Sequence, residues 1–437
     1  MAISPRIEIH PRSALVDQRV TIRLTGLPPN KQVTVRASTR DDDFNRLWES
    51  HAVYKVDIHG KVDLTWRRAL EGTFQGIDGM GLFWSMELGP SAEEECYFRK
   101  TSLDPIRVQI SVEMDGEIVL EGSAVRNFIA KNVIRRDVRM NGLSGVLFVP
   151  NGDGPYPGVI VLGGGDGGIH EHGAALLASH GYAALALGYF KMPGLPEEPL
   201  EIPLEYFQRA IRWLQDRSFA EKQFMAIIGT SLGSLYALLA ASKFSAVNAT
   251  AVYVPISVVL GMGPEKISPA TFRGVALPCL QLPEPTPEEA QYFEQMAQQH
   301  KPVSFNSLHL RALEDDAQVR QSVIQAERMN GPLVMFSGEE DGALPSPFYA
   351  RQIMDRLDSM EFSFEHRHIC YPGAGHAIGL PHAHGLPYIP TYGRLPANSQ
   401  GPLIDFGGNK AANARANADS WKELLRFLAR SYKLATK

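Results

Sequence analysis

The stretch 224–241 limits what this chain can fold into more than any other part of the sequence. The apolar run Met225–Ile228 has the composition of a buried parallel strand, and the small, helix-forming residues Ser234–Ala241 follow shortly after it. Between them stands Gly229-Thr230-Ser231-Leu232-Gly233. A strand, a G-x-S-x-G turn and a helix in this order predict a nucleophile elbow, a strained turn that lifts its serine off the edge of a sheet. The alternative, a glycine-rich turn without chemistry, stays open, since the motif is short and the chain contains 39 glycines.

The residue types around Ser231 suit such an elbow. Glycine has no Cβ, so Gly229 and Gly233 let the strand and the helix approach each other closely. A helix that begins at the serine turns its free N–H groups and the positive end of its dipole toward any oxyanion formed there. The backbone N–H of Leu232, the residue after the nucleophile, is therefore the first expected oxyanion donor.

The length of 437 residues allows two or three domains, and the pattern of predicted secondary structure changes once along the chain. Residues 1–135 contain short alternating runs, such as Val20–Leu24 and Gln32–Arg36, that are separated by turn signals. Many short strands without a long amphipathic helix predict an immunoglobulin-like β-sandwich. No catalytic constellation stands out in this part of the chain.

In residues 136–437, predicted strands alternate with predicted helices, a pattern typical of a mostly parallel, doubly wound sheet. Together with the elbow at Ser231, this pattern predicts an α/β-hydrolase domain. The long excursion 255–330 separates two predicted core strands and contains a proline-capped helix at 285–296. An excursion between core strands must pass over one end of the sheet. We expect either a binding lid or pocket wall, or else a peripheral ornament.

Two loops downstream of Ser231 carry the partners that a serine nucleophile needs. A serine hydroxyl reacts only when a neighbouring base accepts its proton, and the base needs an acid to orient it. In α/β-hydrolases the acid and then the histidine follow the serine along the chain. The loop after one predicted strand contains Asp341, and the glycine-rich turn after the next strand presents His376. We expect Asp341 as the acid and His376 as the base, with Glu339 and Glu340 as rival acids.

The glycine-rich run 163–168 follows another predicted strand and is expected to supply the second oxyanion donor. The candidates are the backbone N–H groups of Gly165, Asp166 and Gly167. The run also satisfies G-x-G-x-x-G, but it lacks the G-K-[ST] of a P-loop and a convincing acidic partner for a dinucleotide. We therefore expect no cofactor.

Other classes of function have weaker support. The pairs His170/His172 and His382/His384 do not match H-E-x-x-H and have no third ligand in evident register, so we expect no metal site. The formal net charge is −5 without basic blocks, which argues against a nucleic-acid partner. The three separated cysteines, the absence of a signal-peptide core and the absence of a membrane-length apolar run predict a cytoplasmic protein without a membrane span. The sequence gives no indication of the oligomeric state.

With these residues in view, the chain resembles the acyl-CoA thioesterase / bile acid-CoA:amino acid N-acyltransferase family over nearly its whole length. The segments 26–37 and 72–84 resemble the N-terminal β-sandwich of that family. The segments 202–207 and 371–376 resemble its catalytic domain, and 407–421 resembles its final helix.

The resemblance implies a serine hydrolase that cleaves acyl-CoA thioesters to free acid and CoA through an acyl-enzyme intermediate. It implies the nucleophile, acid and base roles for Ser231, Asp341 and His376. Conjugating members of the family carry cysteine at the elbow, so serine favours hydrolysis, while the glycine spacing of 163–168 departs from the family pattern. The alternatives are an acyltransferase with an amine or alcohol acceptor, an ester or lactone hydrolase, and a non-catalytic acyl-binding protein.

Overall fold

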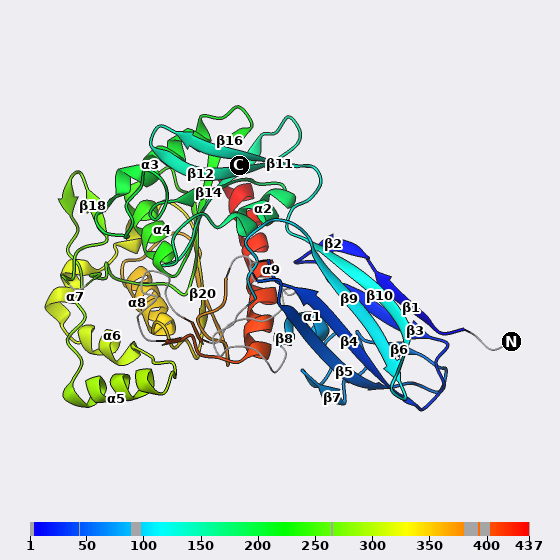
Figure 1. Cartoon of the computed structure of the whole chain (residues 1–437). Helices are drawn as coiled ribbons and strands as arrows, with labels where there is room; N and C mark the ends of the chain where they lie inside the picture. The colour runs from blue at the N-terminus through cyan, green and yellow to red at the C-terminus, as the bar shows by residue number, and fades with distance from the viewer. Residues whose placement is uncertain are drawn as a thin grey trace. The chain divides into compact units, whose positions relative to one another are not determined.

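The computed structural model describes residues 4–42, 44–88, 98–263, 265–379, 392–393 and 403–436. The chain divides into two compact units (Figure 1). The first unit runs through Ala130, and the second begins at Lys131 and includes the C-terminal helix.

The first unit is rich in β-structure, as its alternating sequence predicts. A three-stranded sheet has the order β1 (Arg6–His10), β3 (Thr21–Thr25), β6 (Val62–Asp63). A larger sheet has the order β2 (Ser13–Leu15), β10 (Glu117–Asn127), β9 (Ile106–Met114), β4 (Gln32–Arg40), β5 (Leu47–Lys55), β7 (Glu71–Gly72), and β8 (Glu87–Leu88) also pairs with β5. A short helix, α1 (Gly81–Trp84), precedes β8. Along β4 the residues at every second position, including Val33 and Val35, are buried, because successive side chains of a strand point to opposite faces.

The second unit is built on one eight-stranded sheet. Its order is β11 (Val133–Met140), β12 (Leu143–Pro150), β14 (Ala183–Gly188), β13 (Tyr156–Leu162), β16 (Ala220–Thr230), β17 (Ala249–Tyr253), β20 (Leu333–Gly338), β21 (His366–Tyr371). The pairs from β14 to β21 are parallel, whereas β11 and β12 add antiparallel pairs at one edge. From β13 the chain first adds β14 on one side and later crosses to β16 on the other, so β13 and β16 flank the topological switch point. In such sheets ligands bind at the carboxyl ends of the strands at this point.

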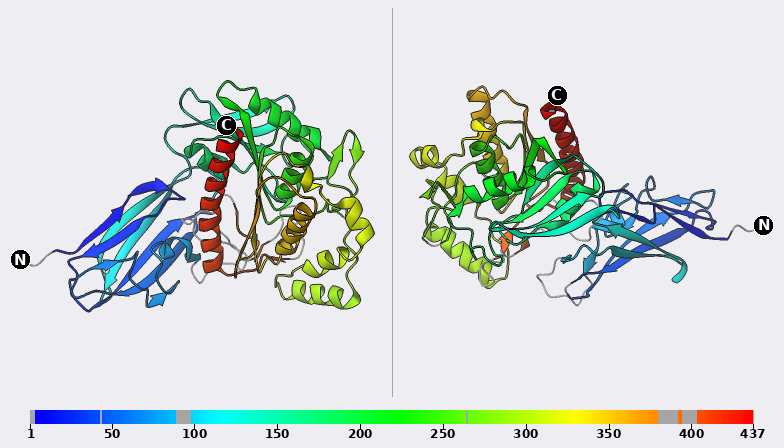
Figure 2. Two further views of the ribbon diagram at one scale, coloured as in Figure 1. Left: turned by 180° about the vertical axis from the view of Figure 1, so that it is seen from behind. Right: turned by 90° about the horizontal axis from the view of Figure 1, so that it is seen from above.

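Helices cover both faces of this sheet (Figure 2). α2 (Glu171–Ser179) and α9 (Lys410–Ala435) pack on one face, and α3 (Leu204–Gln215), α4 (Leu232–Lys243) and α8 (Ser346–Ser359) pack on the other. Because neither face meets solvent, β14 and β20 are buried at every position and read as continuous apolar or small-residue runs. In the described part of the chain, none of the helices combines the length and the hydropathy that crossing a bilayer requires.

The excursion between β17 and β20 carries several short elements. They are β18 (Ala270–Phe272), which pairs with β15 (Ile202–Pro203), then β19 (Val275–Ala276), α5 (Pro287–Gln298), α6 (Asn306–Ala312), α7 (Asp316–Ser322) and a 3₁₀ turn at Ala326–Arg328. β22 (Tyr392–Gly393) pairs with β23 (Ile404–Asp405) further along the chain. No residue of α5 is buried. Its start is fixed by a capping box between Thr286 and Glu289, and Arg311 of α6 holds Glu289 at 2.7 Å.

Candidate active site

Ser231 stands at the turn between β16 and α4. Its backbone has φ 54° and ψ −121°, a conformation that a residue with a side chain rarely adopts. Such strain costs on the order of 1–3 kcal/mol and persists only where the surrounding structure holds it in place. The strand, the strained serine and the helix occur in the order that the G-x-S-x-G pattern predicts.

The two glycines of this turn are required by close backbone approaches. A Cβ on Gly229 would lie 2.1 Å from the carbonyl oxygen of Gly233, and a Cβ on Gly233 would lie 2.3 Å from the carbonyl oxygen of Gly163. Both distances are far below van der Waals contact, and backbone atoms cannot yield as a flexible side chain can. The turn therefore packs against the end of β13, and this contact brings the run 163–168 beside the serine.

The structure brings Ser231, His376 and Asp341 together from three strand ends. The His376 Nε2 atom lies 3.1 Å from the Ser231 Oγ atom. The His376 Nδ1 atom lies 3.0 Å from each carboxylate oxygen of Asp341. The Asp341 side chain is fully buried, and that of His376 is 15% exposed. This geometry lets His376 accept the serine proton at Nε2 while Asp341 holds the Nδ1–H group.

Asp341 is fixed by donors from its own loop. The backbone N–H groups of Ala343 and Leu344 donate to Oδ1 at 3.1 and 3.0 Å, and the Ser346 hydroxyl donates to Oδ2. Hydrogen bonds of this kind stabilise a buried carboxylate and set its orientation. Ser346 was not among the residues predicted from the sequence, although its place at the start of the helix after the acid loop was an available signal. The rival acids Glu339 and Glu340 are exposed.

The turn that carries His376 packs backbone to backbone against the segment around Phe406. A Cβ on Gly375 would lie 2.2 Å from the carbonyl oxygens of both Phe406 and Gly407. The His376 N–H group donates to the Phe406 carbonyl at 2.6 Å. The position of the base thus depends on a segment whose role the sequence analysis did not identify, although its Gly407-Gly408 pair is a turn signal.

A second histidine lies close to the acid without being a rival base. His309 of α6 is buried, and its Nδ1 atom lies 2.9 Å from the Tyr349 hydroxyl. Burial lowers the pKa of His309 to about 4, although the nearby Asp341 charge acts in the opposite direction. His309 is therefore neutral near pH 7 and adds no charge behind Asp341.

The run 163–168 offers backbone donors beside the nucleophile. A Cβ on Gly164 would lie 3.5 Å from the Ser231 Cβ atom. The Gly167 N–H group donates to the Gly164 carbonyl at 3.3 Å. Within the described residues, no acceptor is recorded for the N–H groups of Gly165 and Leu232, and the latter starts α4, where helical N–H groups lack intrahelical partners.

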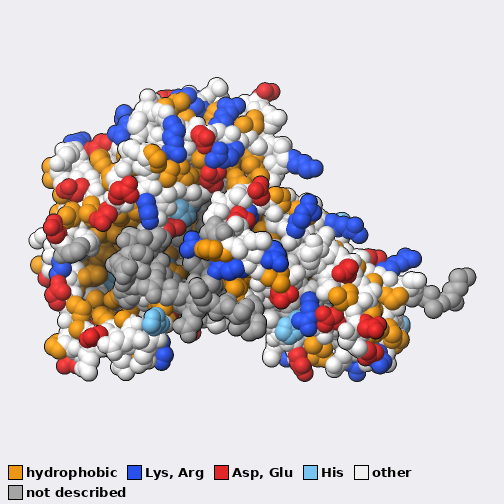
Figure 3. All heavy atoms as spheres, in the orientation of Figure 1, with side chains coloured by type: hydrophobic (Ala, Val, Ile, Leu, Met, Phe, Trp, Pro, Cys, Tyr) orange, Lys and Arg blue, Asp and Glu red, His pale blue; other side chains and the backbone are white. Residues whose placement is uncertain are grey.

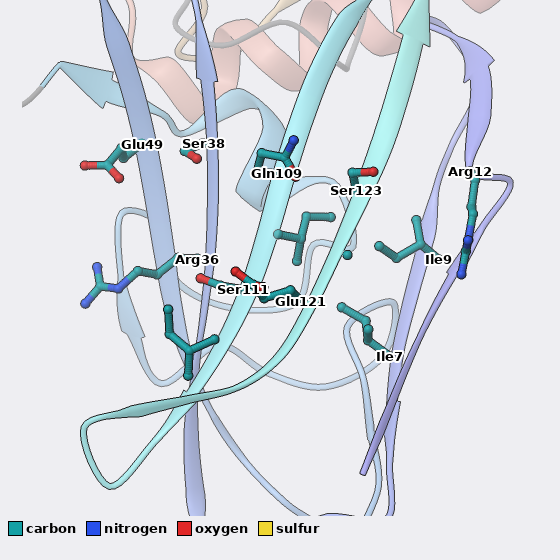
Figure 4. Close-up of a pocket in the computed structure, with 13 residues that line it drawn as sticks. Ile7, Ile9, Arg12, Arg36, Ser38, Glu49, Gln109, Ser111, Glu121 and Ser123 are labelled. Carbon is teal, nitrogen blue, oxygen red and sulfur yellow. The ribbon is translucent and has the colours of Figure 1, made fainter.

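The first unit has a hollow of about 560 Å³ on its larger sheet (Figure 4). Its lining mixes the isoleucines Ile7 and Ile9 with charged groups, and Arg36 among them is engaged by Glu113 at 2.7 Å. Among the described residues that line the hollow, none is a histidine or cysteine, so the nucleophile and base pair found at Ser231 has no counterpart there.

His170, at the N-terminal end of α2, pairs with Asp166, with Nε2 and Oδ1 3.1 Å apart. Over the described ranges of the chain, no group of three or more metal-ligating side chains is assembled. His382 and His384 lie outside the described residues.

Comparisons with known proteins match both units. The family model described as the acyl-CoA thioester hydrolase/BAAT N-terminal region matches residues 17–140, and the BAAT / acyl-CoA thioester hydrolase C-terminal model matches residues 202–433. The acyl-coenzyme A amino acid N-acyltransferase 2 of Mus musculus is 32% identical over 433 residues, with 95% of each chain covered. The acyl-coenzyme A thioesterase 6 of Homo sapiens is 29% identical over 422 residues, with 94% of this chain and 93% of the relative covered. A solved puromycin-hydrolyzing peptidase of Mycobacterium tuberculosis is 15% identical, with a TM-score of 0.43 and coverage of 96% of this chain and 66% of that one.

Proposed function

The chain belongs to the acyl-CoA thioester hydrolase / bile acid-CoA:amino acid N-acyltransferase family, and from this premise we propose that it is a serine thioesterase that hydrolyses acyl-CoA to free acid and CoA. The observation that carries the proposal is the Ser231–His376–Asp341 constellation with serine as the nucleophile. Relatives named acyl-coenzyme A thioesterases, 29–30% identical over most of the chain, support the thioester as the substrate class.

The proposed reaction has two halves. In the first, the Ser231 oxygen attacks the thioester carbonyl while His376 Nε2 takes its proton, and the oxyanion is stabilised by the N–H groups of Leu232 and Gly165. The carbon–sulfur bond then breaks, and CoA leaves with the proton that His376 returns. In the second half, His376 activates water, which attacks the serine ester and releases the acid. Asp341 holds the Nδ1–H group of His376 throughout and stabilises its cation.

The excursion between β17 and β20 is proposed as a wall of the acyl pocket. It is joined to the acid loop, because the Ser304 hydroxyl donates to the Gly342 carbonyl at 2.6 Å and the Asn306 amide donates to the Asp341 carbonyl at 2.7 Å. Hydrophobic side chains gather on the surface over α6 and α7 (Figure 3), and Tyr292 and Leu310 of the excursion are large hydrophobic residues that remain exposed. Exposed apolar groups on a segment that is hydrogen-bonded to the acid loop suit an acyl chain.

We also propose a fold type for the first unit and a cellular location for the protein. An immunoglobulin-like arrangement of the first unit is supported by its two sheets of mostly short antiparallel strands. A cytoplasmic location stays a prediction, since the names of the relatives include a peroxisomal and a mitochondrial enzyme.

The direct test is a panel of acyl-CoAs of different chain length and simple esters, scored for both free thiol and free acid. We expect equal amounts of thiol and acid from at least one acyl-CoA. Cleavage of esters or lactones with no thiol release from any acyl-CoA would support the ester hydrolase alternative instead. Binding of acyl-CoA without any turnover would favour an acyl-binding protein.

The transferase is the second candidate, because relatives of this chain are named acyl-coenzyme A amino acid N-acyltransferases. With Ser231 the intermediate is an oxygen ester, whose resonance lowers its reactivity toward amines, whereas Ser231→Cys would give a thioester. We expect Ser231→Cys, supplied with acyl-CoA and excess glycine or taurine, to form more amide per free acid than the wild type. The total rate should fall, since the larger sulfur must fit the same oxyanion site.

Mass spectrometry of amide and acid from one reaction measures this ratio. An unchanged ratio would mean that the pocket, and not the nucleophile, decides between water and amine. If the wild type already forms mostly amide, the transferase is the correct function.

A further inference from the structure

The pair Asp166–His170 lies near the nucleophile, and the triad does not use it. The Asp166 Oδ1 atom and the Ser231 Cβ atom both lie within 4 Å of the point that a Gly164 Cβ would occupy, at 3.6 and 3.5 Å. The Nε2 atom of His170 lies 3.1 Å from Asp166 Oδ1. An acidic side chain is thus held near the place where the oxyanion forms.

His170 is locked in place by packing as well as by this contact. A Cβ on Gly163 would lie 2.1 Å from the His170 Cδ2 atom, so the imidazole ring lies directly on the start of the run 163–168. The other side of Gly163 meets the elbow, since its carbonyl oxygen lies 2.3 Å from the point that a Gly233 Cβ would occupy. The imidazole ring therefore packs against the run 163–168, and this run packs against the elbow.

The surroundings of His170 favour its cationic form. The Nε2 atom of the ring faces the Asp166 carboxylate, and the backbone of Gly167 also favours the protonated ring. Burial of the ring works against the charge, but Asp166 and the Gly167 backbone outweigh it and raise the pKa of His170 above its ordinary value of 6.5.

Resting on the proposed function, we propose that Asp166 and His170 form a positioning pair for the oxyanion site. The pair holds the run 163–168 against Ser231, and the His170 cation neutralises a carboxylate that would otherwise repel the oxyanion. A like charge near a developing anion opposes its formation. The Asp166 side chain is 49% exposed, so water screens part of this repulsion.

Other charged and titratable groups also lie around His170. Glu171 is held by Arg135 of β11 at 2.7 Å. The Tyr189 hydroxyl donates to the Gly163 carbonyl at 2.8 Å, and burial raises its pKa well above the usual range, so it stays neutral. Lys191, whose Cβ lies 2.9 Å from the point that a Gly167 Cβ would occupy, is a second basic residue beside the run. His172 of α2 is the remaining titratable neighbour in sequence.

The test compares His170→Gln, Asp166→Asn and the double variant. We expect His170→Gln to slow acylation of Ser231 about 10- to 100-fold, less than the 10²–10³-fold cost of losing an oxyanion donor outright. We expect the double variant to be acylated faster than His170→Gln, because removing the carboxylate removes the repulsion. A purely structural role predicts the opposite order, with the double variant the slowest.

The pH profile gives a second readout. A raised pKa keeps His170 charged to higher pH, so the wild-type rate should decline as the pH rises through that pKa and the imidazolium charge facing Asp166 is lost. Asp166→Asn should lack this decline. The matched control is His366→Gln, since His366 forms a similar pair with Asp358 at 2.8 Å, also has a raised pKa, and starts the strand whose opposite end leads to His376. The control should keep the wild-type profile.

Acylation of Ser231 is measured with two assays, so that a failure of the thioesterase proposal can be distinguished from a failure of the positioning-pair proposal. One assay follows thiol release from acyl-CoA, and the other follows labelling of Ser231 by a fluorophosphonate, which bonds to the serine oxygen with loss of fluoride. If labelling follows the expected order while no acyl-CoA is cleaved, the positioning pair stands and the thioesterase proposal falls. If the double variant is slower than His170→Gln in both assays, or if Asp166→Asn keeps the alkaline decline, the positioning pair is refuted.

Discussion

Ser231→Ala is expected to lower turnover of acyl-CoA by about 10⁶-fold, the scale found when a serine nucleophile is removed from such a triad. Without Oγ, no covalent intermediate forms and His376 has no proton to accept. The fold should persist, because alanine removes a single atom and meets the same backbone strain at φ 54° as serine does. Thiol release under saturating substrate measures the loss, and the thermal unfolding midpoint reports the fold.

His376→Ala serves as the companion variant for Ser231→Ala. The two residues act on one proton, so each single change should cost about as much as both together. A Ser231→Ala variant with a rate near that of the wild type would refute the triad and revive the acyl-binding alternative. Losses that multiply in the double variant would mean that the two residues do not act as a unit.

The parts of the second unit that follow from local chemistry were predictable from the sequence. The elbow needs glycines at two contact points and a helix start after the serine, and these requirements are local enough to read in five residues. The buried strand β12 (Leu143–Pro150) could be predicted as well, since a strand covered on both faces forms a continuous run of apolar or small residues. The long C-terminal helix α9 is likewise marked by its apolar periodicity.

Features that depend on the folded path of a loop were less accessible. Three acids stand in a row at 339–341, and only the turn of the chain decides that the third is buried against His376. The pair Asp166–His170 is joined by a loop that leads into a helix, where no sequence period reports contact. The seven-residue helices α6 and α7 were not predicted, because two turns are too short to establish an amphipathic pattern.

The oxyanion donors could be predicted from the sequence only in part. Leu232 follows from the elbow itself, since the residue after the nucleophile always begins the helix. The second donor depends on which N–H of the run 163–168 remains without an internal partner, and the bond from Gly167 to Gly164 forms only when the run closes into its turn. The sequence could therefore name Gly165, Asp166 and Gly167 as candidates but could not choose among them.

Asp341→Asn is expected to lower kcat by about 10⁴-fold, as when the acid of a serine triad is neutralised. The amide fits the same space, but it can present its NH₂ group to His376 Nδ1, and this selects the tautomer whose proton sits on Nε2. That nitrogen then faces the Ser231 hydroxyl as a donor and cannot accept its proton. The two backbone donors to Oδ1 and the Ser346 hydroxyl would also lose a charged acceptor, so a modest fall in the unfolding midpoint should accompany the kinetic loss.

Glu339→Gln and Glu340→Gln are the matched controls, because they make the same chemical change in neighbouring, exposed side chains of the same loop. Neither should alter kcat by more than about twofold, since charges in high dielectric interact weakly with a buried imidazole. A crippling Glu340→Gln with a nearly active Asp341→Asn would move the acid by one residue and contradict the geometry at His376. If all three variants kept their activity, His376 would need no acid partner, and burial of Asp341 would have to be explained by the stability of its loop alone.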